Sequence, residues 1–241
     1  MSISVAMAVF NGEKYITEQI KSILKQLKDN DEVIISYDES TDNTLKIVLD
    51  LAKKDKRIKV FHGPCCGVIK NFENAILNCN NKYIFLSDQD DIWLDNKVET
   101  VLREFKKANA DVILHDTFVS DENLNIIYDS FFQIRNSKKG ILNNIIKNSY
   151  MGCCIAFKND FKKFFLPFPK NIPMHDQWIG LMGEKYGTVR FIKKPLLIYR
   201  RHENNFSALI PVFPNDIESK AAIMYKRLIS RINLLLAIIK N

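Results

Sequence analysis

Three carboxylates stand within four residues in the stretch Ser87-Asp88-Gln89-Asp90-Asp91-Ile92-Trp93. The apolar run 83–86 before them is typical of a short buried strand, so the carboxylates follow a strand end. Carboxylates this close repel one another unless a cation or a solvated turn relieves them. Mg²⁺ and Mn²⁺ prefer oxygen ligands, and Mg²⁺ usually takes one or two carboxylates plus substrate phosphates. The pattern predicts a metal–diphosphate site, with an acidic surface turn as the alternative.

The preceding chain contains the elements that would position this stretch. Strand-like runs at 3–10, 33–35, 58–61 and 83–86 alternate with helical apolar spacing over 16–27, 45–52 and 69–76. This alternation predicts a parallel sheet with right-handed crossovers, in which ligands bind beyond the carboxyl ends of the strands. Polar turns at 11–12, 38–42 and 88–91 follow three of those ends. We therefore expect them to converge in one crevice.

The second half of the chain is less regular. We expect helices at 97–107, 141–146 and 176–186, strands at 112–115 and 196–199, and a turn running into a strand at 151–157. Residues 121–139 predict a hairpin or a mobile loop, and prolines 167, 169 and 173 hold a loop extended. Prolines 211 and 214 mark the one boundary. The expected division is a domain of 1–214, with halves 1–110 and 111–214, and a helical segment 215–241.

The amino-acid composition limits the classes of binding partner that we expect for this protein. The chain has 241 residues, 46% apolar and 26% charged, with a net charge of +7, which indicates a globular protein with anionic partners. Its lysines are scattered and do not alternate with aromatic residues, which disfavours nucleic acid. No apolar run is long enough to span a membrane and no signal peptide is recognisable. The five cysteines match no zinc or disulfide spacing, so we expect reduced thiols and a cytoplasmic protein.

Six motifs, in this order, resemble those of the family 2 glycosyltransferases, and most closely a bacterial rhamnosyltransferase-like branch. The resemblance covers residues 3–207, although Tyr37 and Glu39 replace a common Asp and Gly. The motifs are Val9-Phe10-Asn11-Gly12, Asp38-Glu39-Ser40-Thr41-Asp42, Gly67-Val68-Ile69-Lys70-Asn71-Phe72, the acidic stretch 87–93, His175-Asp176-Gln177-Trp178, and Tyr199-Arg200-Arg201-His202 with Asn205.

The resemblance implies an α/β protein with the glycosyltransferase-A fold: a Rossmann-like, mostly parallel central sheet flanked by helices, here with an added C-terminal helix. It also implies inverting transfer of a sugar from a UDP- or dTDP-sugar to a glycan or lipid-linked glycan in bacterial surface polysaccharide (capsule, O-antigen or lipooligosaccharide). One alternative is a catalytically silent sugar-nucleotide-binding subunit of a glycan-assembly complex. A sugar-1-phosphate nucleotidyltransferase is disfavoured, because Asn11-Gly12-Glu13 stands where that class has a long Gly-rich loop.

The donor-binding residues are expected on the nucleotide-binding half. The base would lie against Phe10, and the Asp38 carboxylate would accept the imide N–H of uracil or thymine, a donor that cytosine lacks. Asp38 could instead cap a helix, and Asn71 could serve helix packing. The expected donor-binding set is Val9, Phe10, Asn11, Asp38, Asn71, Asp88 and Gln89.

The resemblance implies a metal site at Asp90, Asp88 and His202, in which Asp90 contacts the metal most directly and Asp88 often reaches the ribose. Mn²⁺ or Mg²⁺ would bridge both phosphates and neutralise the charge that grows as the nucleoside diphosphate leaves. His202 would supply a metal ligand or a phosphate contact, with a solvated loop histidine as the alternative. The neighbouring Arg200 and Arg201 could contact the phosphates instead.

Asp176 is the expected general base, because inversion needs a carboxylate that deprotonates the acceptor on the face opposite the leaving group. Acceptor-side or supporting positions are Asp91, Trp93, Gly152, Cys153, His175 and Trp178. The basic, apolar-rich helix 217–240, with Lys226, Arg227 and Arg231, would lie on an anionic inner membrane near a lipid-linked acceptor or pack on protein. We favour packing on this domain or on a second subunit in a homodimer.

Overall fold

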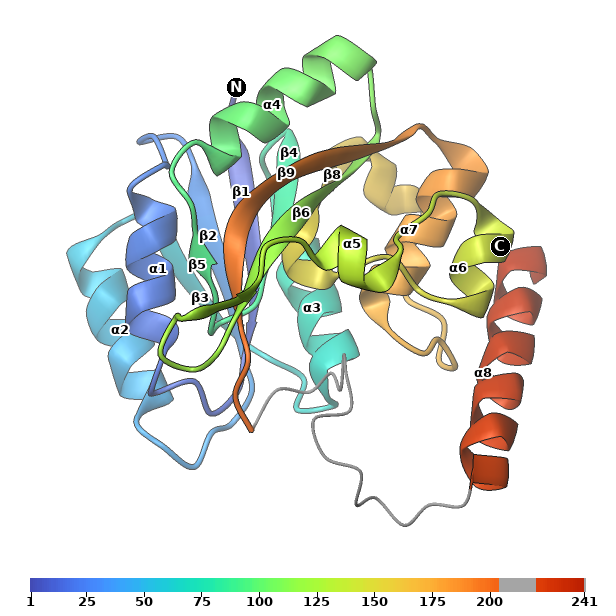
Figure 1. The fold of residues 1–241 in the computed structure, drawn as a ribbon. Coiled ribbons are helices and arrows are strands. Elements are labelled where there is room, and N and C mark those ends of the chain that lie inside the picture. Colours follow the sequence, from blue (N-terminus) through green and yellow to red (C-terminus); the bar gives the residue numbers. More distant parts are fainter. Residues whose placement is uncertain (204–219, 241) are drawn as a thin grey trace.

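The computed structural model describes residues 1–203 and 220–240, with side chains of the last helix described from residue 228 (Figure 1). Its centre is one nine-stranded sheet in the order β3-β2-β1-β4-β8-β6-β9-β5, with β7 paired to β6. The strands are β1 (Ile3–Val9), β2 (Glu32–Tyr37), β3 (Ile58–His62), β4 (Tyr83–Ser87), β5 (Ile92–Trp93), β6 (Val112–Ser120), β7 (Ile126–Tyr128), β8 (Ile155–Lys158) and β9 (Val189–Arg200).

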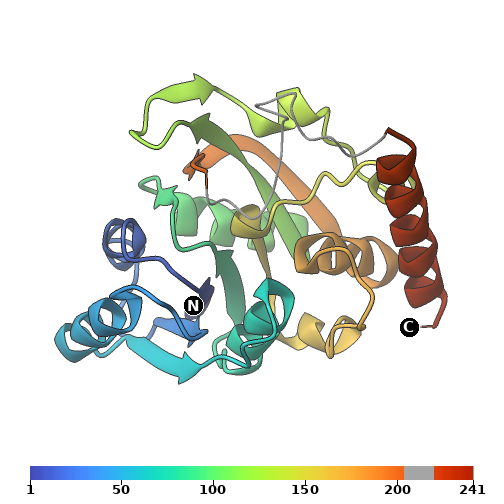
Figure 2. The same cartoon turned by 90° about the horizontal axis from the view of Figure 1, so that it is seen from below.

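The N-terminal half is the predicted parallel sheet. Strands β1, β2 and β3 pair in parallel, and β1 also pairs in parallel with β4. Helices α1 (Ile16–Leu24) and α2 (Thr44–Lys54) lie on one face, and α3 (Val68–Leu77) covers the other (Figure 2). Because the strand order reverses at β1, a crevice is expected beyond the ends of β1 and β4.

Burial explains why the first strand and helix form. Six of the seven residues of β1 are buried, as expected for a strand covered on both faces. In α1, Ile16, Ile20 and Ile23 are fully buried at helical spacing. Each buried side chain of this size contributes roughly 1.5–3 kcal/mol of transfer free energy.

The second half of the sheet is mixed. β8 runs antiparallel to β4 and β6, whereas β6 and β9 pair in parallel. Both β6 and β9 are longer than the predicted strands 112–115 and 196–199. The register shifts where Pro195 stands opposite Asp116. The two lysines and the proline at 193–195 interrupt the apolar pattern there, which hid the true start of β9 from the sequence.

The remaining helices surround this half. Within residues 121–139 the hairpin alternative is correct, because β7 pairs antiparallel with β6, and a short helix follows it. Helix α4 packs on β6 and β9, and α7 packs on β9 and α6. The prediction missed α5, β5 and the second 3-10 turn. The helical elements are α4 (Lys97–Ala108), α5 (Phe131–Arg135), α6 (Ile141–Ile146), α7 (His175–Tyr186), α8 (Lys220–Lys240) and the 3-10 turns η1 (Gly152–Cys154) and η2 (Asn159–Phe164).

Helix α8 packs on the domain, as the favoured alternative predicted. Leu234 and Ile238 are buried, Arg231 donates to the Ile146 carbonyl at 2.7 Å, and Lys185 donates to the Ile238 carbonyl at 2.7 Å. Asn205 and the boundary at residue 214 lie outside the described residues. Within the described ranges, no helix combines the length and the apolar character needed to cross a membrane. All five cysteines are free thiols.

Candidate active site

A cavity of about 890 Å³ lies beyond the carboxyl ends of β1, β2 and β4 and brings together most of the predicted site residues. Its volume is in the range of small-molecule pockets. From the nucleotide-binding half it is lined by Val9, Phe10, Asp38, Asn71, Asp88 and Gln89. Asp90, Gly152, His175 and Asp176 also line it. Asn11, Asp91, Trp93, Cys153, Trp178 and His202 lie outside this lining.

The turn after β1 is tied to the acidic stretch by its backbone. The Phe10 N–H donates to Gln89 Oε1 at 3.0 Å, and Gln89 Nε2 donates back to the Phe10 carbonyl at 2.8 Å. The Phe10 ring stays 54% exposed on the cavity wall. Asn11 has a φ of 47° and accepts from the Thr41 N–H, so it shapes the turn. A Cβ at Gly12 would lie 2.5 Å from Gln89 Oε1, which explains the glycine.

Asp38 and Asn71 line the cavity beside Gly63. Asp38 Oδ1 accepts from the Cys65 N–H at 2.9 Å, and Asn71 Nδ2 donates to the Val9 carbonyl at 3.3 Å. Asn71 Oδ1 is buried without a hydrogen-bond partner among the described residues. Sequence reasoning missed Gly63, where a Cβ would overlap Asp38 Oδ1 and lie 2.8 Å from Asn71 Oδ1. Its only signal was a glycine directly after a strand.

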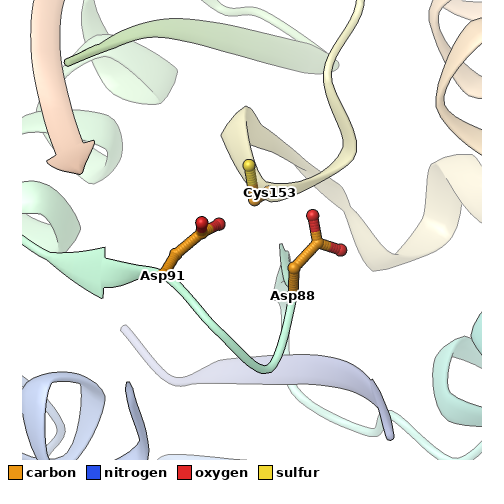
Figure 3. A group of neighbouring side chains, drawn as sticks. All are labelled: Asp88, Asp91 and Cys153. Atoms are coloured by element: carbon orange, nitrogen blue, oxygen red, sulfur yellow. The ribbon is translucent and has the colours of Figure 1, made fainter. Parts of the chain in front are cut away.

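Asp88, Asp91 and Cys153 point toward one another, as Figure 3 shows. One ligand atom from each lies within 4.8 Å of the others. Burial and the neighbouring carboxylates raise the pKa of Asp88 to about 7 and that of Asp91 well above its usual value. Asp91 Oδ1 accepts from the Arg200 N–H, but Oδ2 is buried and lacks a partner within the described chain. Such crowded carboxylates fit the oxygen donors that Mg²⁺ or Mn²⁺ prefers.

The end of β9 holds the acidic turn in place. His202 Nε2 lies 2.9 Å from Asp90 Oδ2, so these two predicted metal ligands are adjacent. Arg200 is 5% exposed, donates to the Asp90 carbonyl at 3.0 Å and pairs with Glu18 at 2.6 Å. Its guanidinium also lies 4.6 Å from the Tyr15 ring centroid. Arg200 therefore packs beneath the turn.

Lys97 is a supporting cation that sequence reasoning missed. It is 1% exposed, donates to the Cys153 carbonyl at 2.9 Å, and lies 4.0 Å above the Trp93 ring. Burial lowers the pKa of Lys97 to about 8. Trp93 packs between Lys97 and Phe85, so its role is support beneath the turn. A lysine at a helix start usually lies in solvent, and only its place after the acidic stretch hinted otherwise.

Asp176 is the second residue of α7 and is half-buried on the far wall of the cavity. Burial raises the pKa of Asp176 to about 6, against hydrogen bonds from the Gln177 N–H and from Asn148 Nδ2 at 3.3 Å. The helix N-terminus also favours the carboxylate form. The group is therefore ionised at neutral pH, with a pKa close enough to the working pH for general-base chemistry.

His175, Gly152 and Trp178 support this wall. His175 stacks on Phe72 at 4.1 Å, and burial lowers its pKa to about 3, so the imidazole is neutral. A Cβ at Gly152 would lie 2.9 Å from His175 Nε2, so the small residue makes room for the imidazole. Trp178 is fully buried and donates its indole N–H to the Phe165 carbonyl at 3.0 Å.

Three further lining residues come from a segment without a recognisable motif. Arg135, Asn148 and Tyr150 reach the cavity from α5 and from the loop after α6. Sequence reasoning described this region as a hairpin or loop and a short helix. No local signal assigned these residues to the site, because the packing of α6 against α7 places them there.

The sequence is similar to a known protein family and to proteins of known name. The family model described as Glycosyl transferase family 2 matches residues 4–165. Glycosyltransferase GlyG of Streptococcus pneumoniae is 34% identical over 121 residues, or 50% of this chain and 40% of GlyG. The dTDP-rhamnosyl transferase RfbG of Shigella flexneri is 30% identical over 223 residues, or 83% of this chain and 72% of RfbG.

A solved structure has a similar fold. S. aureus TarS 1–349 in complex with UDP-GlcNAc aligns with a TM-score of 0.69 and 20% identity. The alignment covers 85% of this chain and 60% of the TarS chain. The chain thus spans less than two thirds of both GlyG and TarS.

Proposed function

Since the chain belongs to glycosyl transferase family 2 and has the glycosyltransferase-A fold, we propose that it transfers a sugar from a UDP- or dTDP-sugar to an acceptor hydroxyl. The acceptor is a glycan or lipid-linked glycan of bacterial surface polysaccharide, and the reaction inverts the anomeric carbon. One observation carries the proposal: a single cavity is lined by Asp38, by the acidic turn at Asp88 and Asp90, and by Asp176.

Recognition of the base uses Phe10 and Asp38. The exposed Phe10 ring offers a stacking surface, and Asp38 Oδ1 is held by the Cys65 N–H. Within the described chain, Asp38 Oδ2 has no hydrogen-bond partner and is available to accept the imide N–H of uracil or thymine. The name of RfbG refers to a dTDP-sugar and the TarS structure contains UDP-GlcNAc, which supports both pyrimidine imides.

The acidic turn would hold a divalent cation. Asp88, Asp90 and Asp91 supply oxygen donors, and His202 lies beside Asp90. The Cys153 thiol contributes less, because burial raises its pKa well above its usual value and keeps it protonated. A bound Mn²⁺ or Mg²⁺ would neutralise charge on the diphosphate. The chain's own part is to hold the turn rigid through Gln89, Arg200 and Lys97.

Asp176 performs the proton transfer. Its carboxylate takes the proton of the acceptor hydroxyl as that oxygen forms a bond to the anomeric carbon. The bond between the anomeric carbon and the β-phosphate oxygen breaks, and the electron pair leaves with the nucleoside diphosphate. Attack and departure on opposite faces invert the configuration.

The second candidate is a silent sugar-nucleotide-binding subunit, which would bind the nucleotide at Phe10, Asp38 and the acidic turn without using Asp176. The ionised, cavity-facing Asp176 favours the enzyme. We place the activity in the cytoplasm, where free thiols such as the five found here persist.

A nucleotide panel tests the proposed function. At about 100 times Kd, UDP or dTDP with Mn²⁺ should raise the melting temperature by roughly 5–10 °C, because a ligand of the folded state stabilises it by mass action. Asp38→Ala should reduce this shift for UDP, whereas Asp29→Ala, in an exposed loop, should not. An equal shift with CDP would contradict the role of Asp38. If the protein binds the nucleotide but transfers no sugar to cell-envelope lipids, the silent subunit is favoured.

The pH dependence of transfer tests the base. Activity should rise as pH increases through about 6, where Asp176 ionises. Asn148→Asp keeps the side-chain oxygen that accepts the Tyr150 N–H. It replaces the amide nitrogen that donates to Asp176 with a negatively charged oxygen. The rising limb should then move upward by about one pH unit or more, since loss of a hydrogen bond and repulsion both disfavour the carboxylate. The control Asn123→Asp, in an exposed loop, should leave the rising limb of the pH profile in place. If Asn148→Asp also leaves the rising limb in place, another group is the base.

A further inference from the structure

A second cavity, of about 680 Å³, lies among α6, α7 and α8. Arg135 and Asn148 line both this cavity and the active-site cavity. Arg135 Nε donates to the Asn148 carbonyl at 3.0 Å, and Asn148 Nδ2 donates to Asp176. Arg135 and Asn148 therefore connect the second cavity to Asp176.

The second cavity is lined by both cationic and aliphatic side chains. Arg135, Lys147 and Arg231 are cationic, and no carboxylate lines the cavity within the described ranges. Ile145 and Leu234, which are 8% and 1% exposed, form an apolar wall. A lining that combines cations with aliphatic carbons suits a ligand with a phosphate attached to a hydrocarbon chain.

The surface beside this cavity is also apolar. Leu142 and Ile146 of α6 are 75% and 65% exposed, and Ile232 and Ile239 of α8 are 44% and 76% exposed. Helices α6 and α8 lie side by side at the edge of the molecule (Figure 1, Figure 2). Exposed aliphatic side chains gathered on neighbouring helices mark an interaction surface for an apolar partner.

We propose that the second cavity binds the phosphate group of a lipid-linked acceptor, with the first part of its lipid chain against Ile145 and Leu234. The inference rests on the proposed function, selects the lipid-linked acceptor from the two classes named there, and assigns its phosphate a binding site. The bound phosphate leaves the attached sugar to extend past Arg135 and Asn148, so that its hydroxyl meets Asp176. Lys147 and Arg231 select acceptors that carry negative charge.

Isothermal titration of the full chain tests this site with dodecyl diphosphate, in EDTA and below its micellar concentration. The amphiphile should bind more tightly than inorganic pyrophosphate and more tightly than dodecyl maltoside. Lys147→Gln should weaken its binding by about tenfold or more, because a charge-assisted hydrogen bond is lost. Lys147→Arg should retain binding, and the remote Lys46→Gln on α2 should have no effect. Arg231→Gln should act like Lys147→Gln if α8 stays docked.

Several outcomes overturn the inference. Equal binding of pyrophosphate shows a bare anion site, and equal binding of dodecyl maltoside shows an apolar site without phosphate selectivity. Vesicles distinguish the acceptor phosphate from membrane headgroups. If the protein binds phosphatidylglycerol vesicles in a Lys147-dependent way, and binds phosphatidylcholine vesicles that contain dodecyl diphosphate no more tightly, the cations bind membrane headgroups. Failure of UDP to stabilise the protein, alongside Lys147-dependent amphiphile binding, refutes the proposed function and leaves this site standing. Stabilisation by UDP, alongside amphiphile binding that does not depend on Lys147, refutes this site alone.

Discussion

Replacing Asp176 with Asn is expected to lower kcat for sugar transfer by about 1,000-fold, within the range that general-base catalysis contributes. The amide cannot take the proton of the acceptor hydroxyl, yet it has nearly the same volume and still accepts the hydrogen bonds from Asn148 and Gln177. Nucleotide binding should therefore persist, because Phe10 and Asp38 on the far wall are unchanged. Steady-state kinetics with and without acceptor, alongside the UDP thermal shift, separate the two effects.

A matched variant shows whether the loss is specific. Asp160→Asn makes the same chemical change at an exposed position of η2 and should retain full activity. If Asp176→Asn keeps more than about a tenth of the wild-type rate, the loss falls below the hundredfold minimum of general-base catalysis, and another group is the base. A parallel loss of the UDP thermal shift would instead place Asp176 in donor binding.

Replacing Asp90 with Ala is expected to abolish the stabilisation by UDP with Mn²⁺ and to reduce transfer by roughly 100-fold or more, since a metal clamp supplies several kcal/mol of charge stabilisation. Asp90 Oδ2 lies 2.9 Å from His202, and the main chain of Asp90 is held by Arg200. Removal of the carboxylate would delete a proposed oxygen ligand without removing the contact between Arg200 and the main chain of Asp90. Adding EDTA to the wild-type protein should reproduce the effect.

Two further variants test which carboxylates would hold the proposed cation. Asp95→Ala, at an exposed residue of the turn between β5 and α4, is the control and should behave as wild type. Asp91→Asn tests the cluster of Asp88, Asp91 and Cys153. If Asp91→Asn removes the Mn²⁺ effect while Asp90→Ala retains it, the cation binds in that cluster and not beside His202. If both variants retain it, the acidic turn does not hold a metal.

The convergence of the polar turns in one cavity could be predicted from sequence because each turn is a local feature of the chain. Each polar turn directly follows its own apolar strand, as Asp38 follows β2 and Asp88 follows β4. Parallel pairing of β1 with β2 and β4 then brings those turns to one edge of the sheet, whatever the details of side-chain packing. Asp176 also carried a local signal, since it stands in the first turn of a helix after a proline-rich loop.

Other features of the site depend on contacts between distant segments. Arg200 reaches the Asp90 carbonyl across 110 positions of sequence because β9 pairs with β5, which directly follows the acidic turn. Lys97 lies under the acidic turn because η1 presents the Cys153 carbonyl to it. Arg135 and Asn148 join the two cavities because α6 packs on α7 and α8. Local apolar periodicity thus determined the parallel strands of the first half, and the polar residues after them determined the positions of the turns. The buried cations and the second cavity were decided by tertiary packing, since burial of a charged side chain depends on partners that no local pattern specifies.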